Sequence, residues 1–115
     1  MAIKYHPAPD VKKRITELIH SHGFKNVTPE RIYCFRSSGS SSRRILARIW
    51  SFPKIWQLAL YMEPRYVIEV LSERYDRLPV HKQDEVLIHE LRHIPKKFSG
   101  GLKKHDHDNP RSLRA

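Results

Sequence analysis

The chain has 115 residues, of which 39% are hydrophobic and 30% are charged, as is usual for a soluble globular protein. This length predicts a single domain over residues 1–115, and the lack of an apolar run of about 18 residues excludes a membrane-spanning helix. The formal net charge is +10, from 22 Lys and Arg against 12 Asp and Glu. Such an excess favours an anionic partner, nucleic acid above all.

Cys34 is the only cysteine in the chain. A lone thiol cannot form an internal disulfide, and the N-terminus lacks the charged-then-apolar pattern of a secretion signal. We therefore expect a cytoplasmic location. Cys34 lies in an apolar run, so we interpret it as a buried packing residue rather than a nucleophile or a metal ligand.

The N-terminal third predicts a helix followed by a strand. The helix is expected from Pro9 or Asp10 to about Ser21, because apolar residues recur there at helical spacing, at Val11, Ile15, Leu18 and Ile19. Gly23 is a suitable stop for this helix. Residues 31–36 are rich in aromatic and β-branched side chains, which is typical of a strand.

Residues 43–50 are predicted as a second strand, with a helix as the alternative. The Ser- and Gly-rich stretch 37–42 would join this strand to 31–36 as an antiparallel hairpin. No acidic residue occurs from Arg31 to Met62, and two tryptophans interleave with the basic residues there. The candidate nucleic-acid contacts in this span are Arg43, Arg44, Arg48 and Lys54. A solvated basic face with both tryptophans in the core is the alternative.

The next stretch is predicted to be mostly extended. Residues 55–61 are interpreted as an extended segment, although a short helix is also compatible with them. Residues 66–71 form the clearest strand pattern in the chain. Glu69 and Glu73 could orient a metal-binding histidine, or they could form a solvent-facing pair.

The strongest motif is His89-Glu90-Leu91-Arg92-His93, an H-E-x-x-H pattern in a helix that Pro79 opens. Residues four apart on a helix share a face, so His89 and His93 would aim their imidazoles at one point. Two neutral imidazoles can hold Zn²⁺ while a neighbouring carboxylate, here Glu90, activates water. Two half-buried histidines without a metal are the alternative.

A catalytic zinc needs a third protein ligand and one open position. Pro95 ends the helix, and Gly100-Gly101 permits a sharp reversal that could return His105 or His107 to the metal. Asp106 and Asp108 are poorer candidates, and a polar mobile tail is the alternative for the whole stretch. Residues 109–115 are predicted to be disordered.

These segments together resemble the metallopeptidases of archaea and phages and, more distantly, the SprT-like zinc peptidase domains. The similarity covers 66–73, 87–95 and 100–106, and extends back to Ile32. It implies that His89, His93 and His105 are zinc ligands, that Glu90 is the general base, and that the strand at 66–71 pairs with the peptide substrate. Arg92 departs from the family pattern, but it should point away from the metal.

The sequence thus predicts a small α+β zincin-like domain with an N-terminal helix, an antiparallel or mixed sheet of about three to four strands and an H-E-x-x-H helix. The expected activity is that of a zinc metalloendopeptidase acting on a protein or peptide, including proteins bound to nucleic acid. The alternative is a basic nucleic-acid-binding module with a structural or vestigial metal site, in which His107 would close the fourth position.

Overall fold

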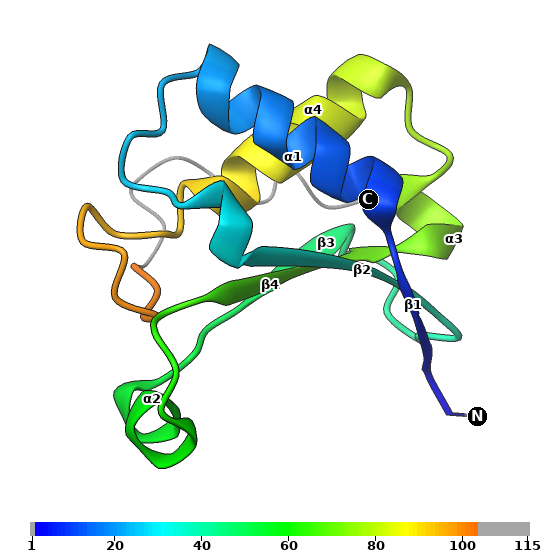
Figure 1. Cartoon of the computed structure of the whole chain (residues 1–115). Helices are drawn as coiled ribbons and strands as arrows, with labels where there is room; N and C mark the ends of the chain where they lie inside the picture. The colour runs from blue at the N-terminus through cyan, green and yellow to red at the C-terminus, as the bar shows by residue number, and fades with distance from the viewer. Residues whose placement is uncertain (1, 104–115) are drawn as a thin grey trace.

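The computed structural model describes residues 2–103 (Figure 1). Nine elements follow one another along this part of the chain. They are β1 (Lys4–Pro7), α1 (Pro9–Ser21), the 3-10 turn η1 (Pro29–Arg31), β2 (Ile32–Ser38), β3 (Ala47–Trp50), α2 (Lys54–Leu60), β4 (Tyr66–Leu71), α3 (Ser72–Tyr75) and α4 (Val80–Leu91).

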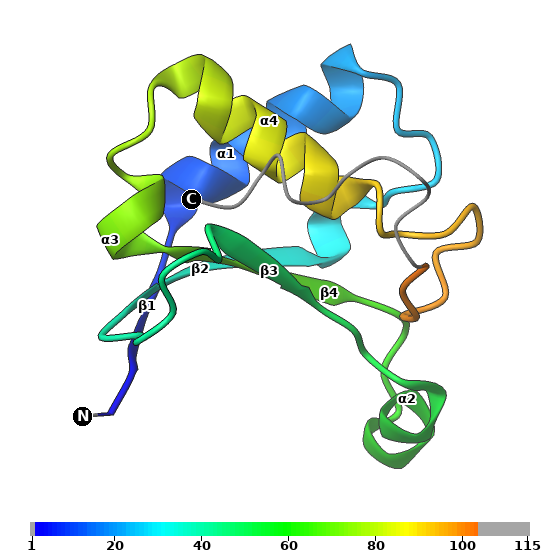
Figure 2. The ribbon, with the colours of Figure 1, turned by 180° about the vertical axis from the view of Figure 1, so that it is seen from behind.

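The four strands form one mixed sheet in the order β1-β2-β4-β3. The central pair, β2 and β4, is parallel, and both outer pairs are antiparallel. Helices α1 and α4 cover one face of the sheet, whereas α2 lies on the other side (Figures 1 and 2). The predicted α+β class and mixed sheet are therefore confirmed, and the architecture is compatible with a small zincin-like domain.

The hydrophobic core lies between the sheet and the two long helices. Helix α1 buries the four predicted residues Val11, Ile15, Leu18 and Ile19. Helix α4 contributes Val86, Leu87 and Leu91, and β4 contributes Ile68 and Val70. Cys34 is 7% exposed and belongs to this core, as predicted for a packing residue.

The predicted hairpin between 31–36 and 43–50 is wrong, because β3 pairs with β4 and not with β2. Five of the six residues of β4 are buried, so this strand takes the central position between the other two. The second strand is also shorter than predicted, since β3 begins only at Ala47. The connection from Gly39 to Leu46 joins β2 to β3, and it is long enough to leave room for β4 between these two strands.

The prediction of an extended segment at 55–61 is also wrong, because residues 54–60 form helix α2. Pro53 is its N-cap, and Tyr61 ends it in the left-handed conformation with φ of 54°. Gln57 is its one buried residue, and its side-chain amide donates to the carbonyls of Phe52 and Ser99 at 2.8 Å each. The helix is thus held by polar anchors rather than by an apolar stripe.

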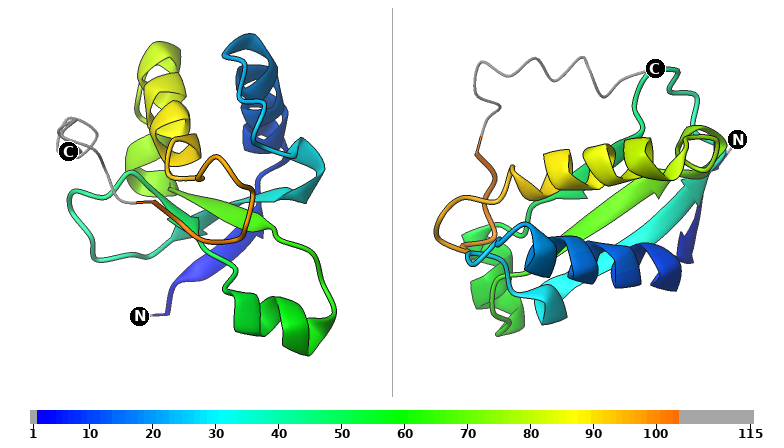
Figure 3. Two further views of the ribbon diagram at one scale, coloured as in Figure 1. Left: turned by 90° about the vertical axis from the view of Figure 1, so that its left-hand side faces the viewer. Right: turned by 90° about the horizontal axis from the view of Figure 1, so that it is seen from above.

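Figure 3 shows α1 and α4 side by side above the sheet, with α2 below it. The Arg14 guanidinium donates to both carboxylate oxygens of Asp84, at 2.8 and 2.6 Å, and so joins the two covering helices. None of the helices between residues 2 and 103 is both long and apolar enough to cross a bilayer.

Candidate active site

The histidine pair lies at the C-terminal end of α4. This helix ends at Leu91, so His89 is on its last turn and His93 lies in the turn that follows. The backbone stays tightly wound there, because Arg92 N–H donates to Ile88 O at 3.0 Å and His93 N–H donates to Glu90 O at 3.1 Å. The two imidazole centroids are 5.1 Å apart, with their planes at 86°. Both rings thus gather at one place, as the spacing predicted.

A backbone carbonyl fixes the tautomer of His93. Its ring Nδ1 lies 3.0 Å from the carbonyl oxygen of Lys103, and Lys103 N–H donates to the carbonyl of His93 at 2.8 Å. A carbonyl oxygen only accepts hydrogen bonds, so Nδ1 is the donor, and in the neutral ring the lone pair is then on Nε2. This is the arrangement of a metal-binding histidine whose second nitrogen is held by the protein.

Glu90 is 8% exposed and is enclosed between α4 and β3. The Ile49 N–H of β3 donates a hydrogen bond to its carboxylate. Burial raises the pKa of the Glu90 carboxyl to about 8, and the hydrogen bond from Ile49 opposes this shift. Burial thus disfavours the ionised form of this side chain.

The described residues contain no group of three His, Cys, Asp or Glu side chains that could hold a metal ion. His89 and His93 are two suitable donors, and a third must come from elsewhere. The candidates His105 and His107 lie outside the described residues, as do Asp106, Asp108 and the predicted disordered tail at 109–115.

The predicted reversal occurs at Gly100, whose φ is +90°. Phe52 N–H donates to the Gly100 carbonyl at 2.7 Å, and Gly100 N–H donates to the Tyr66 hydroxyl at 2.9 Å. The Tyr66 hydroxyl in turn donates to the Gly101 carbonyl at 2.7 Å. These bonds direct the chain back to His93, which it reaches at Lys103.

The strand expected to pair with a substrate is in the wrong place for this role. Strand β4 has β2 on one side and β3 on the other, so its backbone is already paired. The sheet edge nearest α4 is β3, which contacts this helix and whose Ile49 N–H binds Glu90. The strand order decides which strand has a free edge, and the residue pattern of a single strand does not reveal that order.

Glu69 is not placed as expected, whereas Glu73 is exposed, as the solvent-facing alternative had it. The Glu69 carboxylate is 1% exposed, so it is not solvent-facing, and it accepts hydrogen bonds from Ser37, Arg48 and Trp50 on the sheet face away from α4. Glu73 accepts a hydrogen bond from Gly39 N–H at 2.8 Å and so holds the connection after β2. Both carboxylates therefore support the sheet and its loops.

The four candidate nucleic-acid residues are not on a common hairpin. Arg43 and Arg44 are exposed on the connection before β3, and Lys54 is exposed at the start of α2. The Arg48 guanidinium lies 3.3 Å from the Glu69 carboxylate, so its charge is paired.

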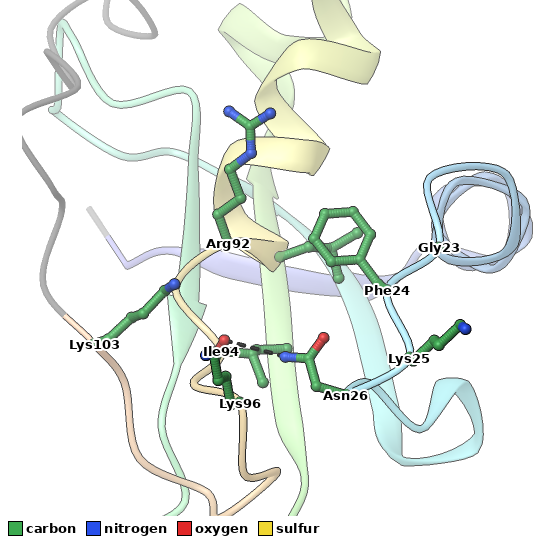
Figure 4. A pocket seen from close by; sticks show the side chains of 9 residues that line it. Gly23, Phe24, Lys25, Asn26, Arg92, Ile94, Lys96 and Lys103 are labelled. Atoms are coloured by element: carbon green, nitrogen blue, oxygen red, sulfur yellow. Dashed lines mark hydrogen bonds between the residues drawn. The ribbon is translucent and has the colours of Figure 1, made fainter.

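A pocket of about 530 Å³ lies beside the last turn of α4 (Figure 4). Helix α1 also ends near this pocket, and Asn26 joins the two ends by donating to the Ile94 carbonyl at 3.3 Å. The cationic residues of its lining are Lys25, Arg92, Lys96 and Lys103. Positive charge is favourable at helix C-termini, which accounts for this lining. Neither His89 nor His93 lines the pocket, so it is separate from the histidine pair.

The sequence did not reveal the residues that hold His93, Glu90 and the loop at 100–101 in place. Ile49 and Lys103 act through backbone groups, which carry no signal in residue type. Tyr66 was assigned to a strand, but its hydroxyl role depends on tertiary contact with the loop at 100–101. Gly100 was the one visible signal, because a left-handed turn favours glycine.

The family model described as "Putative phage metallopeptidase" matches residues 3–111 of the chain. No curated protein and no solved structure gives a significant match.

Proposed function

Because the chain belongs to this phage metallopeptidase family, we propose that it is a zinc-dependent endopeptidase of the H-E-x-x-H type. His89 and His93 would supply two metal ligands, and His105 would supply the third. The observation that carries this proposal is the convergence of the two imidazoles beside the buried Glu90, with the His93 tautomer held by Lys103.

The donor set fits a zinc ion. Neutral imidazole is a preferred zinc ligand, and the held Nδ1 leaves Nε2 of His93 as the donor atom. The return of the chain to His93 at Lys103 supports His105, which lies two residues further on, as the third ligand. A bound zinc would polarise the peptide carbonyl and lower the pKa of water toward ~7.

Glu90 is positioned to move the proton. Its carboxylate would accept a proton from the attacking water and deliver it to the nitrogen of the leaving amine. The hydrogen bond from Ile49 N–H would orient the carboxylate, and the charge of a bound zinc would favour its ionised form, which is the form that accepts a proton. The position of the Glu90 side chain supports this role.

The outer edge of β3 is the surface we propose for the substrate backbone. A strand edge presents N–H and C=O groups to which an extended peptide can add, and on β3 the Ile49 N–H is already bonded to Glu90, so a peptide would use the remaining groups of this edge. Ile49 places this edge directly beside Glu90, so a peptide lying along it would pass the proposed catalytic carboxylate.

The test compares Glu90→Gln with Glu85→Gln, measuring cleavage of an unfolded casein at equal zinc content. Glutamine keeps the shape of the side chain but cannot accept a proton at neutral pH. We expect Glu90→Gln to lose about 10²- to 10⁴-fold in rate. Glu85 is exposed on the same helix and pairs with Lys82 at 3.2 Å, so Glu85→Gln should cleave as the parent does.

Equal cleavage by Glu90→Gln and the parent would remove Glu90 as the general base. A parent protein that keeps stoichiometric zinc but cleaves no unfolded substrate would favour the structural metal site instead. X-ray absorption then distinguishes the two, because a structural site has four protein ligands and a catalytic site has three.

A further inference from the structure

The sheet face opposite α1 and α4 has no helical layer packed over it within the described chain (Figures 1 and 3). The strand register places alternate residues on this face, which we call the open face. Its members are Tyr5 and Pro7 on β1, Tyr33, Phe35 and Ser37 on β2, Val67, Glu69 and Leu71 on β4, and Arg48 and Trp50 on β3.

The apolar part of the open face is mostly aromatic. Trp50 is 49% exposed, Tyr5 is 55% exposed and Tyr33 is 41% exposed. Tyr33, Val67 and Trp50 lie opposite one another in one row across three strands. A shallow pocket of about 300 Å³ opens between Tyr5, Phe35, Trp50, Val67 and Glu69. The face thus presents aromatic rings around a hollow, with Val67 between them, while Leu71 on the same face is buried.

The single carboxylate of this face is already neutralised. Glu69 accepts from the Trp50 indole N–H at 2.9 Å, from the Ser37 hydroxyl at 2.5 Å and from Arg48 at 3.3 Å. These three donors leave Glu69 buried and hold the Trp50 ring in place against the sheet. The open face therefore combines a fixed aromatic platform with no exposed negative charge.

Cationic side chains border the platform. Arg65 donates to the Tyr33 hydroxyl at 3.0 Å, and its guanidinium carbon lies 6.0 Å from the Tyr33 ring centroid. Exposed Arg43 and Arg44 lie on the connection between β2 and β3, and exposed Lys54 begins α2. These two segments lie at opposite ends of the sheet (Figure 1).

We propose that the open face binds single-stranded nucleic acid, with bases stacked on Tyr5, Tyr33 and Trp50 and phosphates contacting the bordering cations. Aromatic rings with basic neighbours are the combination that binds unpaired bases without sequence preference. The strongly exposed aliphatic residues Ile55, Leu58 and Leu60 belong to α2 and not to these strands, so the open face itself offers mainly rings to a partner. A duplex hides its base faces in its own stack, so it would not use these rings. The net charge of +10 is complementary to a phosphate backbone.

Fluorescence anisotropy with labelled 12-nucleotide oligothymidylate and oligouridylate, and with a 12-base-pair duplex, tests this binding. We expect both single strands to bind more tightly than the duplex, with affinity falling as salt rises. The comparison of the two single strands shows whether DNA or RNA is preferred. The assay uses the full chain and does not depend on peptidase activity.

The decisive variant is the double substitution Tyr5→Leu with Tyr33→Leu, matched to Tyr61→Leu. Tyr61 is 95% exposed but follows α2, outside the open face. Loss of two stacking rings should weaken single-strand binding at least ~10-fold, whereas Tyr61→Leu should leave it unchanged. Arg65→Gln should also reduce the slope of log affinity against log salt concentration by about one phosphate contact. Lys13→Gln on α1 should leave this slope unchanged.

Circular dichroism melts establish that each variant is folded before binding is compared. Unchanged affinity of the folded double variant would overturn the proposal, as would tighter binding to the duplex or no binding to either single strand at low salt. Self-association that the double variant abolishes would also overturn it, because a second copy would then cover the open face.

Discussion

His93 and Lys103 exchange two hydrogen bonds, one from Lys103 N–H to the His93 carbonyl at 2.8 Å and one between the His93 Nδ1 and the Lys103 carbonyl at 3.0 Å. This pair of bonds connects the proposed metal ligand to the segment that carries the remaining candidates. His105 follows Lys103 by two residues, which cover at most about 7 Å of extended chain. The loop between residues 94 and 102 therefore determines how the third ligand approaches.

We predict that His105→Ala weakens zinc binding by more than ~100-fold, because it removes one of three ligands. His107→Ala should change the zinc dissociation constant little. His81→Ala is the matched control, since His81 is exposed near the start of α4. Competition against a chromophoric chelator measures all three constants. A larger loss in His107→Ala than in His105→Ala would assign the third ligand to His107.

Gly100→Ala should destabilise the protein, whereas Gly101→Ala should be tolerated. A Cβ at Gly100 would collide with the Phe52 carbonyl, and its φ of +90° is strained for any other residue. The nearest atom to a Cβ at Gly101 is the Ser99 hydroxyl at 3.6 Å, an ordinary contact. We expect Gly100→Ala to lower the free energy of unfolding by about 2–4 kcal/mol in urea titrations. Equal stability of the two variants would show that the loop is not held as described.

Acid should destabilise the contact between α1 and α4. The hydrogen bonds from Arg14 hold the pKa of the Asp84 carboxyl below its ordinary 3.8. Ionised Asp84 therefore stabilises the fold at pH above about 3.8, and this contribution is lost as pH falls through the depressed pKa. Urea titrations between pH 5 and about 2 should show a smaller loss of stability in Asp84→Asn than in the parent. Glu85→Gln, one residue away, should lose stability as the parent does.

Cys34 should react slowly with thiol reagents in the native protein. Burial raises the pKa of its thiol to about 12, so only about one part in 10⁴ is thiolate at pH 8. We expect the reaction with Ellman's reagent to be at least ~100-fold slower in buffer than in urea. Rapid stoichiometric reaction of the native protein would mean that Cys34 is accessible and not part of the core.

The sequence by itself determined the elements that depend on local periodicity. Helix α1 with its four buried residues follows from apolar spacing, and the strand at 66–71 follows from β-branched content. The gathering of His89 and His93 at one place follows from their spacing of four, and the reversal at Gly100 follows from the conformational freedom of glycine. Each of these depends on residues within a few positions of one another.

Only the tertiary structure decided which strands pair and which groups surround the site. The insertion of β4 between β2 and β3 made β3 the edge strand, and five of the six residues of β4 are buried in this central position. That order brought Ile49 N–H to Glu90 and placed Glu69 and Trp50 on the open face. The bonds between His93 and Lys103 likewise join groups ten residues apart, and both use a backbone group of Lys103. Backbone donors and acceptors are the same in every residue, so contacts of this kind appear only when the chain is folded.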